Sequence, residues 1–304
     1  MKINYPIILI VYNRPDHTKK ILSQLNNFKI KKLYIISDGP KAKSLDIKNV
    51  EKTRKIVDEY LIKSKIKFKF KIYSNKNLGL RKRIISGLNT VFKREKVSII
   101  LEDDCIPTKD FFNFIDVMLK KFKNDRTIAS IGGSNYFPKF RVNSSYLKSK
   151  YFNPWGWATW KRAWKFFNPD GYELIEVLKK KNQIRSFNFN NNMAYFKMLK
   201  DQVKGKNDSW AVRWYASAFT KEMYCLYPGK SFVSNIGLDG SGTHCSISED
   251  YQVNLSPNII IEKMQIIQEN QLAKKKFEFF FKRLKQNFFR KFFKSLKSYF
   301  EGNN

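Results

Sequence analysis

The sequence feature that most limits the fold is a regular alternation of apolar and amphipathic stretches between residues 5 and 104. Four runs rich in β-branched residues are separated by stretches with helical spacing of apolar residues: YPIILIVYNRP, KKLYIISDGP, IKFKFKIYSN and KVSIILEDD. Strands that alternate with helices predict a mainly parallel sheet with helices on both faces. We therefore expect an α/β fold.

Polar residues follow each of these four runs, at the point where the expected strand ends. Parallel sheets bind their ligands beyond the carboxyl ends of their strands, so we expect these residues to share one edge of the sheet. They are Asn13 and Arg14, Asp38 and Gly39, Asn75 and Asn77, and the acids Glu102, Asp103 and Asp104. This edge is the first candidate for a functional site.

The later part of the chain has a looser pattern, but no internal repeat or clear linker interrupts it before about residue 262. With 304 residues, of which 42% are hydrophobic, the chain can bury one large core or two modest ones. The absence of a linker favours one core. We expect a single domain over residues 1–262 and a tail over residues 263–304.

The chain is strongly basic, with 59 Lys and Arg against 26 Asp and Glu and a formal net charge of +33. Such a charge fits a nucleic acid, an anionic membrane or a phosphorylated substrate as partner. A general bias towards Lys and Asn explains much of the excess equally well. Charge alone therefore does not choose a function.

The cysteines and the N-terminus bear on the compartment. Cys105, Cys225 and Cys245 have neither the pairing nor the spacing of a disulfide framework or a zinc site, which favours a reducing compartment. The apolar run within MKINYPIILIVYNRPDH is too short for a signal peptide or a membrane span. We expect a cytoplasmic protein.

Three consecutive acids, Glu102, Asp103 and Asp104, end the fourth strand-like run. Neighbouring negative charges repel one another, so a positive partner is expected beside them. Oxygen ligands that leave room for substrate phosphates suit Mn²⁺ or Mg²⁺. The alternative is a solvated acidic turn or a helix cap before the stretch TKDFF.

At this point the sequence resembles the GT-A glycosyltransferases. The resemblance covers roughly residues 5–247 and is closest to the inverting group that includes N-acetylglucosaminyltransferase I and bacterial sugar transferases of the family-2 type. It rests on VYNRPDHTKKILSQL, IISDG, LEDDCIPTKDFF and NDSWAVRW. It implies a GT-A type, Rossmann-like sheet flanked by helices, and a nucleotide-sugar as donor substrate.

The resemblance assigns roles to residues at the sheet edge. It implies that Arg14 lies against the uridine or its phosphates and that Asp38 accepts a hydrogen bond from the uracil imide. Within LEDDCIPTKDFF it makes Asp104 the metal ligand, with Glu102 and Asp103 as nucleotide contacts. The implied metal is Mn²⁺ or Mg²⁺, and Asp38 favours a uridine diphosphate sugar.

The stretch NPWGWATWKRAW has small residues between its tryptophans, which lets backbone approach a flat ring or the face of a sugar. The resemblance favours Trp155, Gly156 and Trp157 as part of the acceptor or sugar pocket. Ordinary core packing accounts for the same pattern equally well.

In NDSWAVRW, Asp208 resembles the general base of the inverting family, which takes the proton of the acceptor hydroxyl as its oxygen attacks the anomeric carbon. The sequence departs from the family pattern here, since Ser209 stands where a second acid is expected. Without the resemblance, Asp208 is the N-cap of the helix that contains Trp210 and Trp214. One residue can perform both roles.

Two further stretches contain candidates for binding. NIGLDGSGTHC is rich in glycine, like segments that order over a bound nucleotide, and the resemblance puts His244 near the metal or diphosphate. NKNLGLRKR presents Asn77 and Arg81 near the third strand, where amides at a helix N-terminus can meet phosphate. A solvated basic turn is the alternative for the second stretch. We expect His17 to cap the first helix or face solvent.

Residues 271–304 have the pattern of a basic amphipathic helix. Its apolar positions recur at steps of three or four with lysines between them: Phe277, Phe281, Leu284, Phe288, Phe292, Leu296 and Tyr299. Over residues 274–300 such a helix can lie on an anionic membrane, which would hold the protein on the inner face of the cell membrane. The alternative is that it docks on its own domain or on a partner.

Together these features favour a metal-dependent inverting glycosyltransferase. It would move a sugar from a nucleotide-sugar to a hydroxyl acceptor, either free or lipid-linked, in synthesis of a bacterial surface glycan such as lipopolysaccharide, lipooligosaccharide or capsule. A nucleotidyltransferase of related strand order is one alternative, and a basic membrane- or nucleic-acid-binding protein is another. The acids at the sheet edge argue against nucleic acid entering there. The donor sugar, the acceptor and the oligomeric state stay open.

Overall fold

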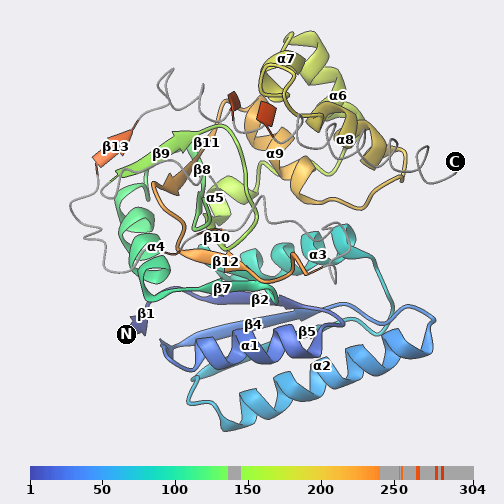
Figure 1. Ribbon diagram of the computed structural model, residues 1–304, viewed down its shortest axis with the longest axis vertical. Helices are drawn as coiled ribbons and strands as arrows, with labels where there is room; N and C mark the ends of the chain where they lie inside the picture. Colours follow the sequence, from blue (N-terminus) through green and yellow to red (C-terminus); the bar gives the residue numbers. More distant parts are fainter. Residues whose placement is uncertain are drawn as a thin grey trace, which may run out of the picture.

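The computed structural model describes residues 1–135 and 145–239, together with positions 253, 255, 265–267, 278–279 and 282–283. The described residues form a nine-stranded sheet in the order β13-β9-β11-β8-β10-β6-β2-β4-β5, with helices on both of its faces (Figure 1). Five of its eight strand pairings are parallel. The α/β, Rossmann-like fold expected from the alternating pattern is confirmed.

The N-terminal half supplies four parallel strands, β2 (Ile7–Val11), β4 (Lys32–Ser37), β5 (Phe68–Tyr73) and β6 (Val97–Glu102). In space they lie in the order β5-β4-β2-β6, so the first strand along the chain pairs with both the second and the fourth. Strand β2, which has a neighbour on each side, is apolar throughout because both of its faces are covered.

The connecting helices change sides between β2 and β6. Helices α1 (Pro15–Leu25) and α2 (Ser44–Lys63) pack on one face of the sheet, and α3 (Leu80–Arg94) packs on the other (Figure 1). In open α/β sheets, the crevice at such a change of side is where ligands bind. The carboxyl ends of β2 and β6 are therefore the place to look for a site.

The C-terminal half continues the sheet with strands of mixed direction. Strand β10 (Trp157–Trp160) runs antiparallel between β6 and β8 (Ile128–Gly132). Beyond them lie β11 (Tyr224–Pro228), β9 (Ser145–Ser149) and β13 (Gln265–Ile267). Because β13 pairs with β9, the sheet extends past residue 262, and the expected boundary between domain and tail was wrong.

Two short pairs of strands stand outside the main sheet. Strands β1 (Lys2–Ile3) and β3 (Lys29–Ile30) are parallel. Strands β7 (Cys105–Pro107) and β12 (Val233–Asn235) are antiparallel, and they bring a late segment of the chain beside the end of β6.

The remaining helices complete the two layers. Helix α4 (Lys109–Lys121) joins α1 and α2 on their face. The opposite face carries α3 and the C-terminal helices: α5 (Lys161–Trp164), α6 (Gly171–Lys180), α7 (Ile184–Phe187), α8 (Tyr195–Val203) and α9 (Ala211–Thr220). Among the described helices, none is both long and apolar enough to cross a membrane.

An aromatic cluster fills the core beneath these C-terminal helices. Trp157 stacks on Trp210, with ring centroids 5.6 Å apart, and both contact Phe152. Trp157 is 0% exposed, so a sugar cannot contact it, and its expected place in a sugar pocket was wrong. Its ring points from a central strand into the core, which is the alternative that its pattern left open.

The tail and one cysteine fall largely beyond the described part of the chain. Positions 278–279 and 282–283 are helical, as expected for the tail, while its apolar stripe lies outside the described residues. Cys105 and Cys225 are buried free thiols, and Cys245 also lies outside the described residues.

Gly156 is required where the chain enters β10. Its φ is +65°, and a Cβ there would lie 2.8 Å from Cγ2 of Val233. The Gly156 carbonyl also accepts a hydrogen bond of 2.7 Å from the Gly133 amide. Gly156 therefore has a structural role at the start of β10, whatever ligand lies nearby.

We expect Gly156→Ala to lower the free energy of unfolding by about 2–4 kcal/mol, because backbone strain and a steric clash add. Gly205→Ala is the matched control: Gly205 has φ +74° but no atom within 4 Å of its Cβ position, so only the strain of roughly 1–2 kcal/mol applies. Urea denaturation of both variants measures the difference. Equal losses would show that the contact with Val233 relaxes at no cost.

Candidate active site

The carboxyl ends of β2 and β6 bring a basic residue and three acids together. Ile10 of β2 lies opposite Glu102 of β6 in the parallel register, so the residues that follow each strand emerge side by side. Nη2 of Arg14 pairs with Oδ1 of Asp103 and lies 2.9 Å from Oδ2 of Asp104. Arg14 is a positive partner of the acids from within the chain, and the divalent cation expected beside them stays a prediction.

Burial sets the electrostatics of this cluster. Burial, followed by repulsion from Asp104, raises the pKa of Glu102 to about 8, although Arg14 opposes the rise. Burial also raises the pKa of Asp103 to about 6, against the attraction of Arg14. Asp103 is 2% exposed and Asp104 is half-buried. The cluster therefore has more acidic groups than the one guanidinium that contacts it can neutralise.

The segment 235–239 covers one side of the cluster. The Ile236 amide donates to the carbonyl oxygen of Asp104 at 2.9 Å. A Cβ at Gly237 would lie 2.4 Å from Oδ2 of Asp104 and 2.9 Å from Nη1 of Arg14, so a larger residue there would have to displace these side chains. The pairing of β12 with β7 holds this segment in place.

His17 fastens the same segment from α1. Its Nε2 lies 3.3 Å from the Ile236 carbonyl oxygen and 3.3 Å from Oδ2 of Asp239. His17 is buried, so the expectation that it faces solvent or caps the helix was wrong. His244, the binding residue expected in the glycine-rich stretch NIGLDGSGTHC, lies outside the described residues.

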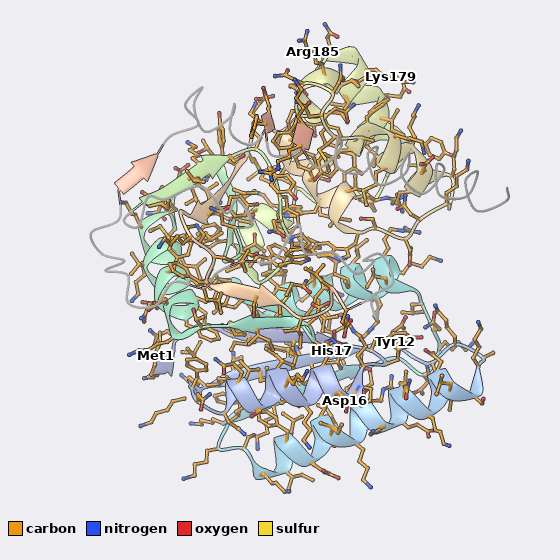
Figure 2. All side chains as sticks on the ribbon, in the orientation of Figure 1. Met1, Tyr12, Asp16, His17, Lys179 and Arg185 are labelled. Carbon is orange, nitrogen blue, oxygen red and sulfur yellow. The ribbon has the colours of Figure 1, made fainter. Side chains whose placement is uncertain are left out.

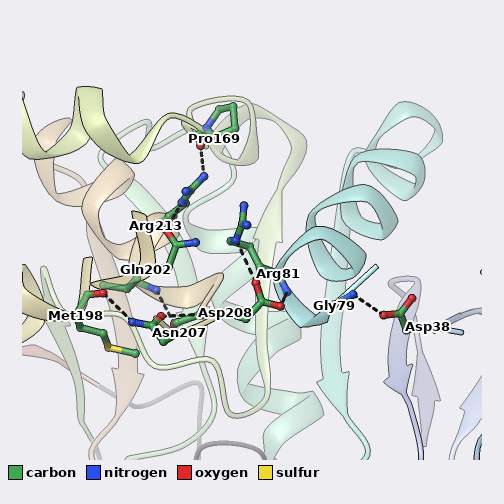
Figure 3. Close-up of polar contacts among 11 residues, drawn as sticks. Asp38, Gly79, Arg81, Pro169, Met198, Gln202, Asn207, Asp208 and Arg213 are labelled. Carbon is green, nitrogen blue, oxygen red and sulfur yellow. Dashed lines mark hydrogen bonds and ion pairs between the residues drawn. The ribbon is translucent and has the colours of Figure 1, made fainter. Parts of the chain in front are cut away.

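Asp38 ends β4 and binds the backbone at the start of α3. Its carboxylate accepts from the amides of Gly39 and Leu78 at 3.0 Å and of Gly79 at 2.9 Å (Figure 3). Burial raises the pKa of Asp38, and these amide donors oppose that rise. The geometry supports a role in positioning residues 78–79. Recognition of a uracil imide by Asp38 stays a prediction.

Asn77 links the ends of three strands. Its side-chain amide donates to Oη of Tyr12 at 3.0 Å and to the Gly39 carbonyl oxygen at 2.7 Å. Tyr12 in turn donates to Asp46 at 2.6 Å. Asn77 therefore lies on the expected edge of the sheet, with its amide group used by neighbouring residues.

Asp208 caps α3 from a distant part of the chain. Helix α3 begins after Gly79, which has no side chain to cap it, and Oδ2 of Asp208 accepts from the Arg81 amide at 3.2 Å. Oδ1 of Asp208 also lies 3.3 Å from Nε of Arg81 (Figure 3). The expectation that Asp208 caps α9 was wrong, because Oγ of Ser209 accepts from the Val212 amide there.

Trp155 and Asp208 are accessible on the C-terminal side of this edge. Because β10 is antiparallel to β6, the residues before β10 emerge beside the end of β6, and Trp155 is half-buried there. The Asp208 side chain is 41% exposed, so a reactant can reach its carboxylate.

The donor set of the acid cluster can be compared with the needs of a metal ion. Among the described residues, no three His, Cys, Asp or Glu side chains converge to hold a metal by themselves. Magnesium-type sites commonly use one or two carboxylates and take the rest of their ligands from substrate phosphates and water. The carboxylate of Asp104 provides hard oxygen donors at the edge of the sheet, so Asp104 fits a site of this kind.

The glycine-rich stretch that begins at Asn235 was named as a binding candidate from the sequence, but the contacts that segment 235–239 makes with the acid cluster were missed. Its glycines signalled unusual backbone, but nothing local indicated that Gly237 would pack against Arg14 and Asp104. Only the pairing of β12 with β7, more than 120 residues apart in the chain, creates that contact.

No family model matches the sequence, and no curated protein matches it. Solved structures similar to this chain include the mannosyltransferase PcManGT from Pyrobaculum calidifontis in complex with GDP-Man and Mn²⁺, with a TM-score of 0.37 and 11% identity over 71% of this chain and 74% of that one. The galactosyltransferase LgtC in complex with donor and acceptor sugar analogues has a TM-score of 0.36 and 9% identity over 73% and 72%.

A third similar structure is a CMP-2-keto-3-deoxy-manno-octonic acid synthetase complexed with CTP, with a TM-score of 0.32 and 11% identity over 60% of this chain and 86% of that one. Likeness at this level carries no argument about the activity of this chain. The fold described above rests on its own strand order and helix placement.

We expect Asp38→Asn to lower the free energy of unfolding by about 1–3 kcal/mol, because the new NH₂ group faces backbone donors and leaves a buried amide unpaired. Asp208→Asn is the matched control. Its contacts are at a half-exposed position, where such pairs contribute less than about 1 kcal/mol. Chemical denaturation compares the two, and a larger loss in Asp208→Asn would contradict the positioning role of Asp38.

Proposed function

We propose that this protein is a glycosyltransferase that uses a nucleotide-sugar donor. The observation that carries the proposal is the convergence of Arg14 with Asp103 and Asp104 at the carboxyl ends of β2 and β6, where the helices change sides. Such a crevice suits a nucleotide. An edge that presents both acids and a guanidinium suits a diphosphate bound together with a cation.

In this proposal Asp104 is the protein ligand of Mn²⁺ or Mg²⁺. The bound ion would neutralise the charge that develops on the departing nucleoside diphosphate. Arg14 is close enough to Asp104 to contact the same diphosphate. The nucleotide contacts of Glu102 and Asp103 are proposed from the resemblance alone. Asn77, on the loop before α3, and Arg81, in the first turn of α3, are the proposed contacts on the other side of the edge.

Asp208 is the proposed general base of an inverting transfer. An exposed carboxylate can take the proton of an acceptor hydroxyl as that oxygen attacks the anomeric carbon. The ion pair with Arg81 and the Arg81 amide hold the Asp208 carboxylate in one orientation. Half-buried Trp155 offers a face for a sugar ring.

The finer parts of the proposal concern the donor and the acceptor. A uridine diphosphate sugar is the proposed donor, from the resemblance at Asp38. The proposed acceptor is a hydroxyl of a growing bacterial surface glycan. A basic tail that binds the inner face of the cell membrane would bring the enzyme to a lipid-linked glycan there.

The purified full chain with Mn²⁺ should release nucleoside diphosphate from one member of a panel of nucleotide-sugars, with UDP-sugars as the first group to assay. We expect chelation of the metal, or Asp104→Ala, to reduce the release at least 100-fold. Glu176→Gln, an exposed acid paired with Lys179 on α6, is the control with normal activity. Full activity in Asp104→Ala would reject the metal assignment. Release of pyrophosphate from a nucleoside triphosphate would instead establish a nucleotidyltransferase.

We expect Asp208→Asn to reduce kcat about 100-fold or more while the affinity for the nucleotide changes little, because the amide cannot accept a proton. Steady-state kinetics and calorimetric binding of UDP with Mn²⁺ separate the two effects. NMR of the product would show inversion at the anomeric carbon. A variant that keeps more than a tenth of wild-type kcat would exclude Asp208 as the base.

A further inference from the structure

The guanidinium of Arg14 lies where a metal-binding acid cluster would receive its cation. It contacts Asp103 directly and lies 2.9 Å from Oδ2 of Asp104, the carboxylate proposed above as the metal ligand. Its own side chain is 18% exposed, so much of this contact is shielded from water. Shielding strengthens the attraction between the opposite charges.

We propose that Arg14 is the resting-state counter-ion of these acids and that it must leave Asp104 before a divalent cation can bind. This inference rests on the proposed function, and it concerns how the same site is regulated. A divalent ion on Asp104 and a guanidinium on the same carboxylate are like charges in contact, and each disfavours the other. The chain therefore binds the metal weakly while Arg14 stays in place.

The backbone around the cluster limits where Arg14 can go. A Cβ at Gly237 would come within 2.9 Å of Nη1 of Arg14 and 2.4 Å of Oδ2 of Asp104, so the segment closes the pair on that side. The Ile236 amide holds the same segment on the Asp104 carbonyl oxygen. The Arg14 side chain is 18% exposed, so among the described residues it keeps some access to solvent, from which a donor would approach.

A diphosphate at that edge gives Arg14 a new partner. Guanidinium groups bind phosphate oxygens with two parallel hydrogen bonds, so the nucleotide can draw Arg14 away from Asp104. The metal then binds to the vacated oxygen. Metal and nucleotide thus increase each other's affinity by the same factor, as linkage requires, and part of that factor acts through Arg14.

The test is Mn²⁺ binding to the full chain, measured by electron paramagnetic resonance with and without UDP. In Arg14→Met, we expect Mn²⁺ alone to bind at least 10-fold tighter than in the wild type, and UDP to add less to its affinity. Arg14→Lys, which keeps the charge but not the fork of donors, should fall between the two. Arg185→Met is the control, since Arg185 lies on α7 at the far end of the molecule from His17 (Figure 2).

Thermal shift gives an independent readout that does not depend on catalysis. Mn²⁺ without UDP should raise the melting temperature of Arg14→Met more than that of the wild type, because a ligand that binds only the native state stabilises it. This measurement also shows whether the variant is folded.

The outcomes separate this inference from the proposed function. If wild type and Arg14→Met bind Mn²⁺ alone equally well, or the variant binds it more weakly, while both bind Mn²⁺ in the presence of UDP, the inference is wrong and the function stands. If neither folded protein binds Mn²⁺ with or without UDP, the metal-dependent function fails and the inference fails with it.

Discussion

The arrangement of the site depends on the attraction between Arg14 and the two aspartates at the end of β6. Asp103 is almost fully buried, and a buried carboxylate without a partner is too costly to keep ionised. Parallel pairing of β2 with β6 puts Arg14 within reach, so the fold itself provides the compensating charge. Segment 235–239 can pack over the cluster because that charge is already balanced in part.

A second set of contacts joins the two halves of the molecule at the start of α3. Asp38 from the N-terminal half binds the amides of Leu78 and Gly79, and Asp208 from the C-terminal half binds the amide of Arg81. The first amides of a helix have no partner within the helix and favour negative groups. Acids from two distant segments meet this need, which fixes the proposed base relative to the nucleotide-binding half.

The fold of the first hundred residues could be predicted from the sequence because its signals are local. Runs such as IILIV keep both faces of a parallel strand apolar. In the helices between such runs, apolar residues recur every three to four positions. Strand β10 could not be predicted in this way, since WATW is too short to show a period and its partners, β6 and β8, are distant in sequence. The same strand explains why Trp157 is core and not a sugar contact.

Part of the candidate site could also be predicted from the sequence. Residues that directly follow strands, such as Arg14 and Asp104, could be assigned to one edge from topology alone, and the structure brings these two together. Asp208 could be singled out, but its contact is with a residue 127 positions away, which no local pattern reveals. The shared first turn of α3 also restricts how the chain can vary in length. One residue inserted between Leu78 and Arg81 would change which backbone amides face the two acids, so insertions are expected to accumulate among α6, α7 and α8 instead.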